Sequence, residues 1–381
     1  MVLGLALLAG CGTQPTAQPS EKTAQAKTPV TLNIATAGDT NMEELQRLSV
    51  GKDFSTANPG VSINVVGTGP GDAGSQKIYE KLKAQKDAGK TEWDMDVAIV
   101  HQSAMKALVD NGLLEKWVPL SANKSYVTSA DSKNSLGTDV DGYVIPLFHS
   151  QVAIAYNPEK VKNPPADFQG LEEWIKANPK RFGYNGVTGG MSGVAFVDSY
   201  VYWKTGDYIQ LSAGPLDKTL ENKWPAAIKE LKSLPVTYTN GNNGTLDMLN
   251  RGEIDMGAVW VDMFTLWQND GRMNPNFKQK LIAPGLPGQP MYVVIPKNAK
   301  NKEWAIKYAD FLTSPEQQAK VIVEKYGWYP GIDAAATLPK VSEKAKQKLF
   351  SDITAEELSA KGLSFPLAQY MSDLNTAYGK N

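Results

Sequence analysis

From residue 31 onward, the chain alternates short apolar runs, rich in β-branched residues, with longer amphipathic stretches. This alternation is typical of an α/β fold whose strands are mostly parallel. Strands are predicted at 31–35, 61–66 and 96–100, and each is followed by a stretch with the apolar spacing of a helix. The folded chain is therefore expected to begin with a βαβαβα lobe.

A second lobe is expected because 381 residues exceed what one hydrophobic core usually holds. We place lobe 1 at 30–148 and lobe 2 at 149–280, with parts of 280–381 returning to lobe 1. The crossover is predicted near 148–150, and residues 300–381 have a mostly helical pattern, in which Ser314 caps a helix that starts at Pro315. The other predicted elements are strands at 143–147, 151–156, 256–261 and 291–295, and helices at 194–203 and 246–249.

The N-terminus carries the most specific local signal. An apolar run at 2–9 leads into Leu8-Ala9-Gly10-Cys11, which resembles a bacterial lipobox with Cys11 as the site of lipidation. The run is far shorter than the roughly 20 residues needed to cross a bilayer, so residues 1–11 are predicted to be a signal peptide. No Lys or Arg precedes the run, which departs from the signal pattern, and the alternative is a buried strand with an inert cysteine. Residues 12–29 lack large apolar side chains and are predicted to be a flexible tether.

Charge and the scarcity of metal ligands exclude several classes of function. The net charge is -1, from 39 Lys+Arg and 40 Asp+Glu, which favours neither nucleic acid nor an anionic surface as a partner. Once Cys11 is lipidated, no other cysteine remains for disulfides or metal, and the two histidines form no zinc motif. No metal, cofactor or enzymatic activity is therefore expected.

Taken together, several stretches resemble the extracellular solute-binding proteins of bacterial ABC importers. They are the lipobox with its tether and the segments 148–157, 251–257 and 309–318. The resemblance implies a type II periplasmic-binding-protein fold: two α/β lobes, mixed or parallel sheets, hinge strands and a helical C-terminal region. It also implies a monomer outside the cytoplasmic membrane, periplasmic or at the cell surface, that is held by a lipid anchor and delivers a small solute to the importer's permease.

Residues just past strand ends are the candidates for ligand binding, because ligands of open α/β sheets bind there. Asp39, Thr40 and Asn41 follow the first strand, and simple N-capping is an equally good interpretation. Gln102 and Ser103 follow the third strand, after His101, with the same alternative. His149 and Ser150 are predicted to face the cleft at the hinge, and a structural role for the histidine is the alternative.

In the second lobe, the glycine-rich start of the helix near residue 194 offers backbone N–H groups to a polar ligand. Trp260 and Asp262 end a predicted strand and combine an aromatic face with a carboxylate. Trp328 and Tyr329 are predicted to lie on a loop after a helix, although core packing is the commoner role of such side chains. The candidates in this part of the chain are Gly190, Ser192, Gly193, Trp260, Asp262, Trp328 and Tyr329.

Ligand identity stays open in the sequence. A carbohydrate, polyol or phosphorylated polyol is favoured, and a thiamine- or polyamine-like cation comes next. A ferric-ion binder of the same fold is one alternative. The other is an NAD-dependent Rossmann oxidoreductase, because residues 69–74 match the dinucleotide fingerprint, although Pro70 lies in the turn and the motif follows the second strand instead of the first.

Overall fold

The computed structural model describes residues 29–380. The predicted signal peptide, Cys11 and almost all of the predicted tether lie outside these residues. Among the described helices, none combines the length and the apolar character needed to cross a membrane.

Most strands join one mixed sheet, with the order β2-β1-β3-β11-β6-β9-β7-β8. Parallel pairing links β1 to β2 and β3, and again β7 to β8 and β9. In contrast, β11 is antiparallel to β3 and β6, and β6 is antiparallel to β11 and β9. The strands are β1 Val30–Ala37, β2 Val61–Gly69, β3 Val97–His101, β4 Asn134–Ser135, β5 Thr138–Asp139, β6 Val144–Tyr156, β7 Phe182–Tyr184, β8 Thr237–Tyr238, β9 Met256–Trp260, β10 Lys278–Lys280, β11 Leu286–Val294, β12 Tyr329–Pro330 and β13 Gly362–Leu363.

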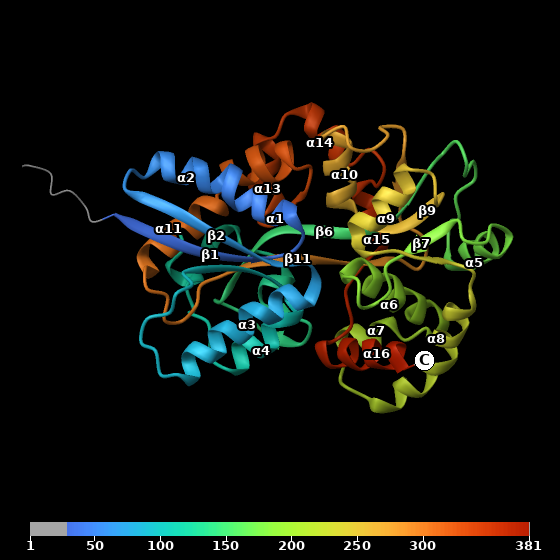
Figure 1. Cartoon of the computed structure of the whole chain (residues 1–381), viewed down its shortest axis with the longest axis horizontal. Coiled ribbons are helices and arrows are strands. Elements are labelled where there is room, and N and C mark those ends of the chain that lie inside the picture. Colours follow the sequence, from blue (N-terminus) through green and yellow to red (C-terminus); the bar gives the residue numbers. More distant parts are fainter. Residues whose placement is uncertain (1–28, 381) are drawn as a thin grey trace, which may run out of the picture.

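Helices cover both faces of this sheet (Figure 1). The α-helices are α1 Thr40–Glu44, α2 Gly51–Ala57, α3 Gly71–Asp87, α4 Met105–Asp110, α5 Phe168–Ala177, α6 Met191–Thr205, α7 Tyr208–Ala213, α8 Trp224–Ser233, α9 Gly241–Asn250, α10 Val261–Asn269, α11 Lys302–Leu312, α12 Pro315–Gln317, α13 Ala334–Thr337, α14 Glu343–Leu349, α15 Ala355–Lys361 and α16 Ala368–Lys380. Shorter or wider helical turns are η1 Leu45–Val50, η2 Gln102–Ala104, η3 Val118–Leu120, η4 Lys124–Tyr126, η5 Ala130–Ser132, η6 Lys218–Lys223, η7 Gln318–Lys325 and η8 Leu338–Lys340.

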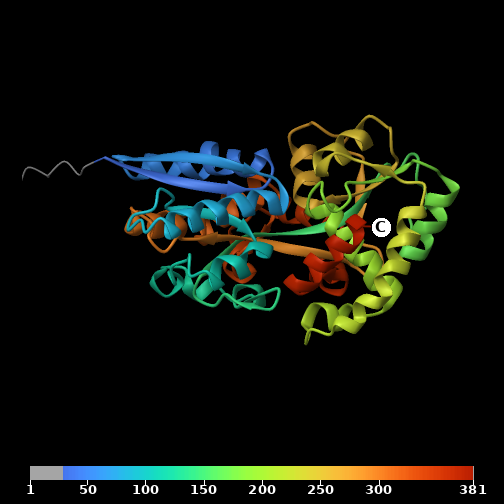
Figure 2. The ribbon, with the colours of Figure 1, turned by 60° about the horizontal axis from the view of Figure 1, so that its bottom comes forward.

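Two hydrophobic cores define two lobes. The first core contains β1, β3 and α11 of lobe 1 and extends into α9, β9 and α10, where β9 pairs with β7 of lobe 2; the second core contains β7, α6, α8 and α16. The C-terminal part is thus shared, since α11 lies with lobe 1 and α16 with lobe 2 (Figure 1). β6 and β11, which we call the hinge strands, run from one core to the other across the middle of the molecule (Figure 2).

Lobe 1 has the predicted βαβαβα order, and β3 is buried along its whole length, as expected of a central parallel strand. One prediction at the hinge is wrong. The runs 143–147 and 151–156 are not two strands, because β6 continues without a break from Val144 to Tyr156. The backbone of 148–150 stays extended because β6 pairs continuously with β11 and β9. The polar side chains of His149 and Ser150 do not interrupt this pairing.

Local capping explains where several helices begin. Ser314 accepts a hydrogen bond from the backbone N–H of Gln317, and Pro315 takes the first helical position, as predicted. α6 begins after Gly190, whose φ of 134° only glycine adopts readily, and it ends at Gly206 in the left-handed region. The backbone at Gly190 therefore sets the direction in which α6 starts.

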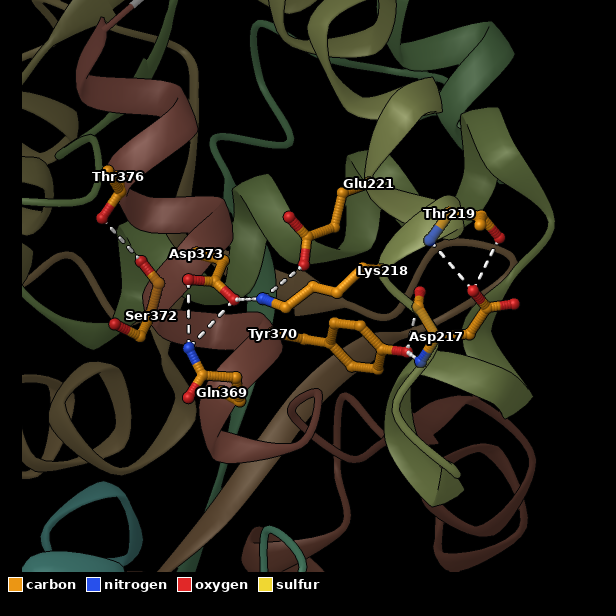
Figure 3. A network of polar contacts seen from close by, with 9 residues as sticks. All are labelled: Asp217, Lys218, Thr219, Glu221, Gln369, Tyr370, Ser372, Asp373 and Thr376. Atoms are coloured by element: carbon orange, nitrogen blue, oxygen red, sulfur yellow. Dashed lines mark hydrogen bonds and ion pairs between the residues drawn. The ribbon is translucent and has the colours of Figure 1, made fainter.

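The C-terminal helix is held on lobe 2 by a polar network between α16 and η6 (Figure 3). Lys218 forms ion pairs with Asp373 and, at 2.9 Å, with Glu221. The Tyr370 hydroxyl accepts a hydrogen bond from the Asp217 backbone N–H and donates to the Asp217 carbonyl at 3.2 Å. Because the Tyr370 ring is fully buried, this network fixes α16 to the lobe 2 core.

Within α6, Asp198 is fully buried and neither of its carboxylate oxygens has a hydrogen-bond partner. Burial raises the pKa of Asp198 well above its ordinary value, and the charge of Asp72 adds to this rise. The unfolded chain ionises near pH 4 while the folded chain keeps the proton, so the folded state loses stability as the pH rises from about 4.

We expect Asp198→Asn to unfold at a higher temperature than the wild type near pH 8, by about 1 kcal/mol or more of unfolding free energy, with the gain shrinking near pH 4. Thermal melts across this pH range measure the difference. A gain that is the same at every pH would show that the charge of Asp198 is not its cause.

Candidate functional site

A cavity of about 60 Å³ lies between the two lobes, on one face of the hinge strands. Lobe 1 contributes the loops after β1, β2 and β3, and lobe 2 contributes the starts of α6, α9 and α10. The lining residues are Gly38, Asp39, Asn41, Met42, Pro70, Gly71, His101, Phe148, Ser150, Gly189, Gly190, Met191, Ser192, Asn242, Trp260, Asp262, Met263, Gln289 and Met291. This is the position at which open α/β sheets bind ligands.

On the lobe 1 side, Asp39 precedes α1 as its N-cap, yet its side chain makes no capping hydrogen bond. The capping interpretation of this residue therefore does not hold. Instead the carboxylate lines the cavity, and burial raises its pKa above the ordinary value. Because burial disfavours the charged form of this carboxylate, a cation placed beside it would stabilise that form.

On the lobe 2 side, Asp262 lies in the first turn of α10 and is buried. Its carboxylate accepts a hydrogen bond from the hydroxyl of Ser150 on β6. Burial raises the pKa of Asp262 to about 6, and the nearby charge of Asp39 contributes to the rise. The two carboxylates thus repel each other across the cleft, and a positive charge between them would relieve that repulsion.

Among residues 29–380, no Lys or Arg lines the cavity, so none of these residues neutralises the two carboxylates there. His101 is the other ionisable side chain there. It is buried, and burial lowers its pKa, which favours the neutral ring. Its Nδ1 lies 3.1 Å from the Ser75 hydroxyl, which fixes the ring. Above the pKa of Asp262, the cleft is therefore negatively charged.

The two lobes touch at the mouth of the cleft. A β-carbon on Gly71 of lobe 1 would lie 3.4 Å from the Cα of Gly190 in lobe 2. Both residues have positive φ values, 60° and 134°. Glycine at both places lets the two backbones come into contact, so the cavity is shut off on this side.

Three lining side chains are buried and carry a polar atom without a hydrogen-bond partner. They are Asn41, Asn242 and Gln289, which are 4%, 6% and 5% exposed, and the atoms are Asn41 Oδ1, Asn242 Nδ2 and Gln289 Oε1. Buried polar atoms are nearly always paired, because an unpaired one costs roughly 1–3 kcal/mol. Three such atoms around one cavity indicate groups that a bound solute would pair.

Seven of the predicted site residues line this cavity, from both lobes and the hinge: Asp39, Asn41, Ser150, Gly190, Ser192, Trp260 and Asp262. Ser192 is fully buried and donates its hydroxyl hydrogen bond to Asn185 Oδ1 at 3.0 Å. It therefore offers the cavity its backbone, at the start of α6, more than its hydroxyl.

The prediction that His149 faces the cleft is wrong, because side chains alternate along a strand and its neighbour Ser150 points to the cavity. His149 lies on the opposite face of the hinge strands, beside Asp131 at 3.3 Å. There a second cavity of about 560 Å³ separates β6 from the C-terminal elements. Gln102 and Tyr329 line this second cavity instead of the cleft.

Four further predicted residues also lie outside the cleft cavity. Thr40 is exposed on α1, and Ser103 donates a hydrogen bond to Asp72. Gly193 is buried against the carbonyl of Gly186. Trp328 is 1% exposed and stacks behind the cavity wall on Phe148, with ring centroids 4.4 Å apart, so it is a core residue and not part of an exposed loop.

Asn242 and Gln289 line the cavity but are not among the site residues predicted from the sequence. A signal exists for Asn242, since the Asn- and Gly-rich segment 240–244 follows β8 and starts α9, in the same strand-to-helix position as Asp39. Gln289 gives no such signal. It lies in mid-strand, and only its pairing with Ser150 across the hinge strands places it at the cavity.

The comparisons with known proteins agree with this geometry. The model of the bacterial extracellular solute-binding protein family matches residues 49–349. The putrescine-binding periplasmic protein SpuD of Pseudomonas aeruginosa (strain UCBPP-PA14) is 26% identical over 298 residues, which cover 75% of this chain and 77% of SpuD.

Two solved structures show the likeness in fold. The tagatose-bound solute-binding protein of an ABC transporter from Thermotoga lettingae is 19% identical, with a TM-score of 0.70, and the match covers 91% of this chain and 92% of that one. The spermidine/putrescine-binding protein PotD of Streptococcus pneumoniae is 15% identical, with a TM-score of 0.63 and coverage of 92% and 98%.

The fold and the cleft define a two-lobed binding protein of type II, which confirms the predicted fold class. The chain belongs to the bacterial extracellular solute-binding protein family. It is the solute-binding component of an ABC transporter, a class that binds small solutes outside the cytoplasm and passes them to a permease. The Rossmann alternative is not favoured, and the segment 69–74 that suggested it lies at the lobe contact.

Proposed function

We propose that this protein captures a small, positively charged amine in the cleft between its lobes, without converting it chemically. The observation that carries the proposal is the pair of carboxylates, half-buried Asp39 and buried Asp262, in a cavity that no Lys or Arg of residues 29–380 lines. An ammonium group between them would hydrogen-bond to both and lift their mutual repulsion.

The sequence favoured a carbohydrate over a cation, and the carboxylates of the cleft support the opposite order. Neutral sugars gain hydrogen bonds from carboxylates but do not offset the negative charges of Asp262, which is buried, and Asp39, which is half-buried. SpuD, the curated relative, is by its name a putrescine-binding protein, which supports an amine. For the ferric alternative, no group of three or more His, Cys, Asp or Glu among residues 29–380 is placed to hold a metal ion.

We further propose that the protein acts as a monomer and that Cys11 carries a lipid anchor. We also propose that the permease of the importer recognises the protein when its two lobes are closed. The contact of Gly71 with Gly190 supports closure, since the two lobes meet at residues that line the cavity. Closure converts solute binding into a shape that a membrane partner can recognise.

A thermal-shift screen of residues 29–381 tests the amine proposal, with putrescine, γ-aminobutyrate, butylamine, maltose and tagatose as probes. A probe at a hundred times its dissociation constant stabilises the folded state by about 2.7 kcal/mol. We expect a raised melting temperature with amines and none with the sugars. A rise with a sugar alone would contradict the proposal and restore the carbohydrate interpretation.

The binding of an amine is expected to weaken in acid. Below about pH 6 Asp262 takes up a proton and loses the charge that attracts an ammonium group. Affinity for an amine probe should therefore be about tenfold lower near pH 5 than near pH 8, which calorimetric titration at the two values measures. Equal affinity at both values would show that the charge of Asp262 does not take part.

A further inference from the structure

We propose that the amine also carries a hydrogen-bond acceptor, a carboxylate, that pairs with Asn242 in the lobe 2 wall, so that the solute is a short zwitterion and not a diamine. This inference rests on the proposed capture of an amine. It comes from the polar groups of the lobe 2 wall, where a donor is buried without a partner.

Asn242 provides this donor, and its orientation is fixed by the fold. Its Oδ1 accepts a hydrogen bond of 2.8 Å from the backbone N–H of Trp260, so the other side-chain atom is the Nδ2 donor. The residue lines the cavity, is 6% exposed, and its Nδ2 has no hydrogen-bond partner within the part of the chain that the structure describes. A second ammonium group would meet this donor with another donor, whereas a carboxylate would pair with it.

The wall around Asn242 is positively polarised by two helix starts. Asn242 lies in the first turn of α9, a helix of 10 residues, and α6, of 15 residues, begins at Met191. The two starts are adjacent, since a β-carbon on Gly241 would lie 3.4 Å from the carbonyl oxygen of Gly189. The free N–H groups of a helix start stabilise a negative charge, and here they lie beside the unpaired Asn242 donor.

The cleft therefore offers groups of opposite character to one solute. Asp39 and Asp262 are its acidic groups, and Asn242 with the starts of α6 and α9 donates hydrogen bonds. A cavity of about 60 Å³ has room only for a short solute, far below the roughly 300–1,000 Å³ of sites for drug-sized ligands. A short amino acid, with an ammonium group and a carboxylate, matches these groups in charge.

Four probes with the same four-carbon chain test the inference on the wild type: γ-aminobutyrate, putrescine, butylamine and butyrate. Calorimetric titration near pH 8 gives a dissociation constant for each. We expect γ-aminobutyrate to bind at least about tenfold more tightly than putrescine and butylamine, because only its carboxylate pairs with Asn242.

Asn242→Asp is the diagnostic variant. It keeps the oxygen that accepts the Trp260 N–H and replaces the donor with a second carboxylate oxygen. The preference should reverse, with putrescine binding more tightly than to the wild type and γ-aminobutyrate about tenfold or more weakly. Asn250→Asp is the matched control, because it adds the same charge to α9 at an exposed residue outside the cavity, and it should leave the wild-type order unchanged.

The outcomes separate the two proposals. If putrescine or butylamine binds the wild type as tightly as γ-aminobutyrate, the zwitterion inference is wrong and the amine proposal stands. If butyrate binds most tightly, or none of the four binds, both are wrong. An Asn242→Asp variant that gains affinity for putrescine is necessarily folded, so a reversed order of probes supports the inference without ambiguity.

Discussion

Asp262→Asn is expected to weaken the binding of an amine probe by more than about a hundredfold near pH 8, since removing one partner of a buried charge pair costs roughly 2–5 kcal/mol. The substitution keeps the size of the side chain and its contact with Ser150, and it removes the charge. The remaining dependence on pH should also be smaller than in the wild type, because the group with a pKa of about 6 is gone. Calorimetric titration near pH 5 and pH 8 measures both effects.

The free protein provides the check that this loss is not misfolding. Burial opposes the charge of Asp262, so the unliganded Asp262→Asn variant should melt at the same temperature as the wild type or higher near pH 8. Asp94→Asn is a suitable control, because this carboxylate is exposed and pairs with Lys81 far from the cavity lining. Unchanged affinity in Asp262→Asn would remove the main support for an amine as the solute.

Gly193→Ala is expected to destabilise the protein by about 3 kcal/mol, the upper end of the usual cost of overpacking. A β-carbon there would lie 1.7 Å from the carbonyl oxygen of Gly186 and 2.8 Å from Asn185 Oδ1. The backbones of Gly186 and Gly193 cannot move apart without displacing the start of α6, which lines the cleft. The midpoint of urea unfolding measures the loss, and affinity for an amine should fall together with it.

Gly379→Ala is the matched control for this prediction. Gly379 lies in α16 and a β-carbon there would meet no atom within 4 Å, so alanine should be neutral or slightly stabilising. If Gly193→Ala unfolds at the wild-type urea concentration, the close contact between α6 and the loop at Gly186 does not exist in solution.

Most of the architecture could be predicted from the chain. The alternation of apolar runs and amphipathic stretches is enough to give the βαβαβα order of lobe 1, because parallel strands buried on both faces need continuous apolar residues. The continuous strand β6 could not be predicted, since His149 and Ser150 interrupt its apolar pattern. They are tolerated because each faces a cavity, on opposite faces of the hinge strands.

The candidate site was predictable where it follows the rule of strand ends, as at Asp39 and Asp262. It was not predictable where a side chain reaches the cleft through pairing between distant strands, as Gln289 does beside Ser150. Trp328 is the reverse case, a residue that was predicted to bind the ligand but lies in the core. The segment after η7 looks like a loop in the sequence, but the Trp328 ring packs between Phe148 and Tyr326, so only the tertiary structure reveals it as a core residue.

The most direct test of the central claim is a crystal structure of the protein grown with γ-aminobutyrate near pH 8. We expect the solute in the cleft between the closed lobes, with its nitrogen within hydrogen-bond distance, about 3 Å, of the carboxylates of Asp39 and Asp262. A solute seated in the cavity behind the hinge strands, or an empty cleft in crystals soaked to saturation, would contradict it.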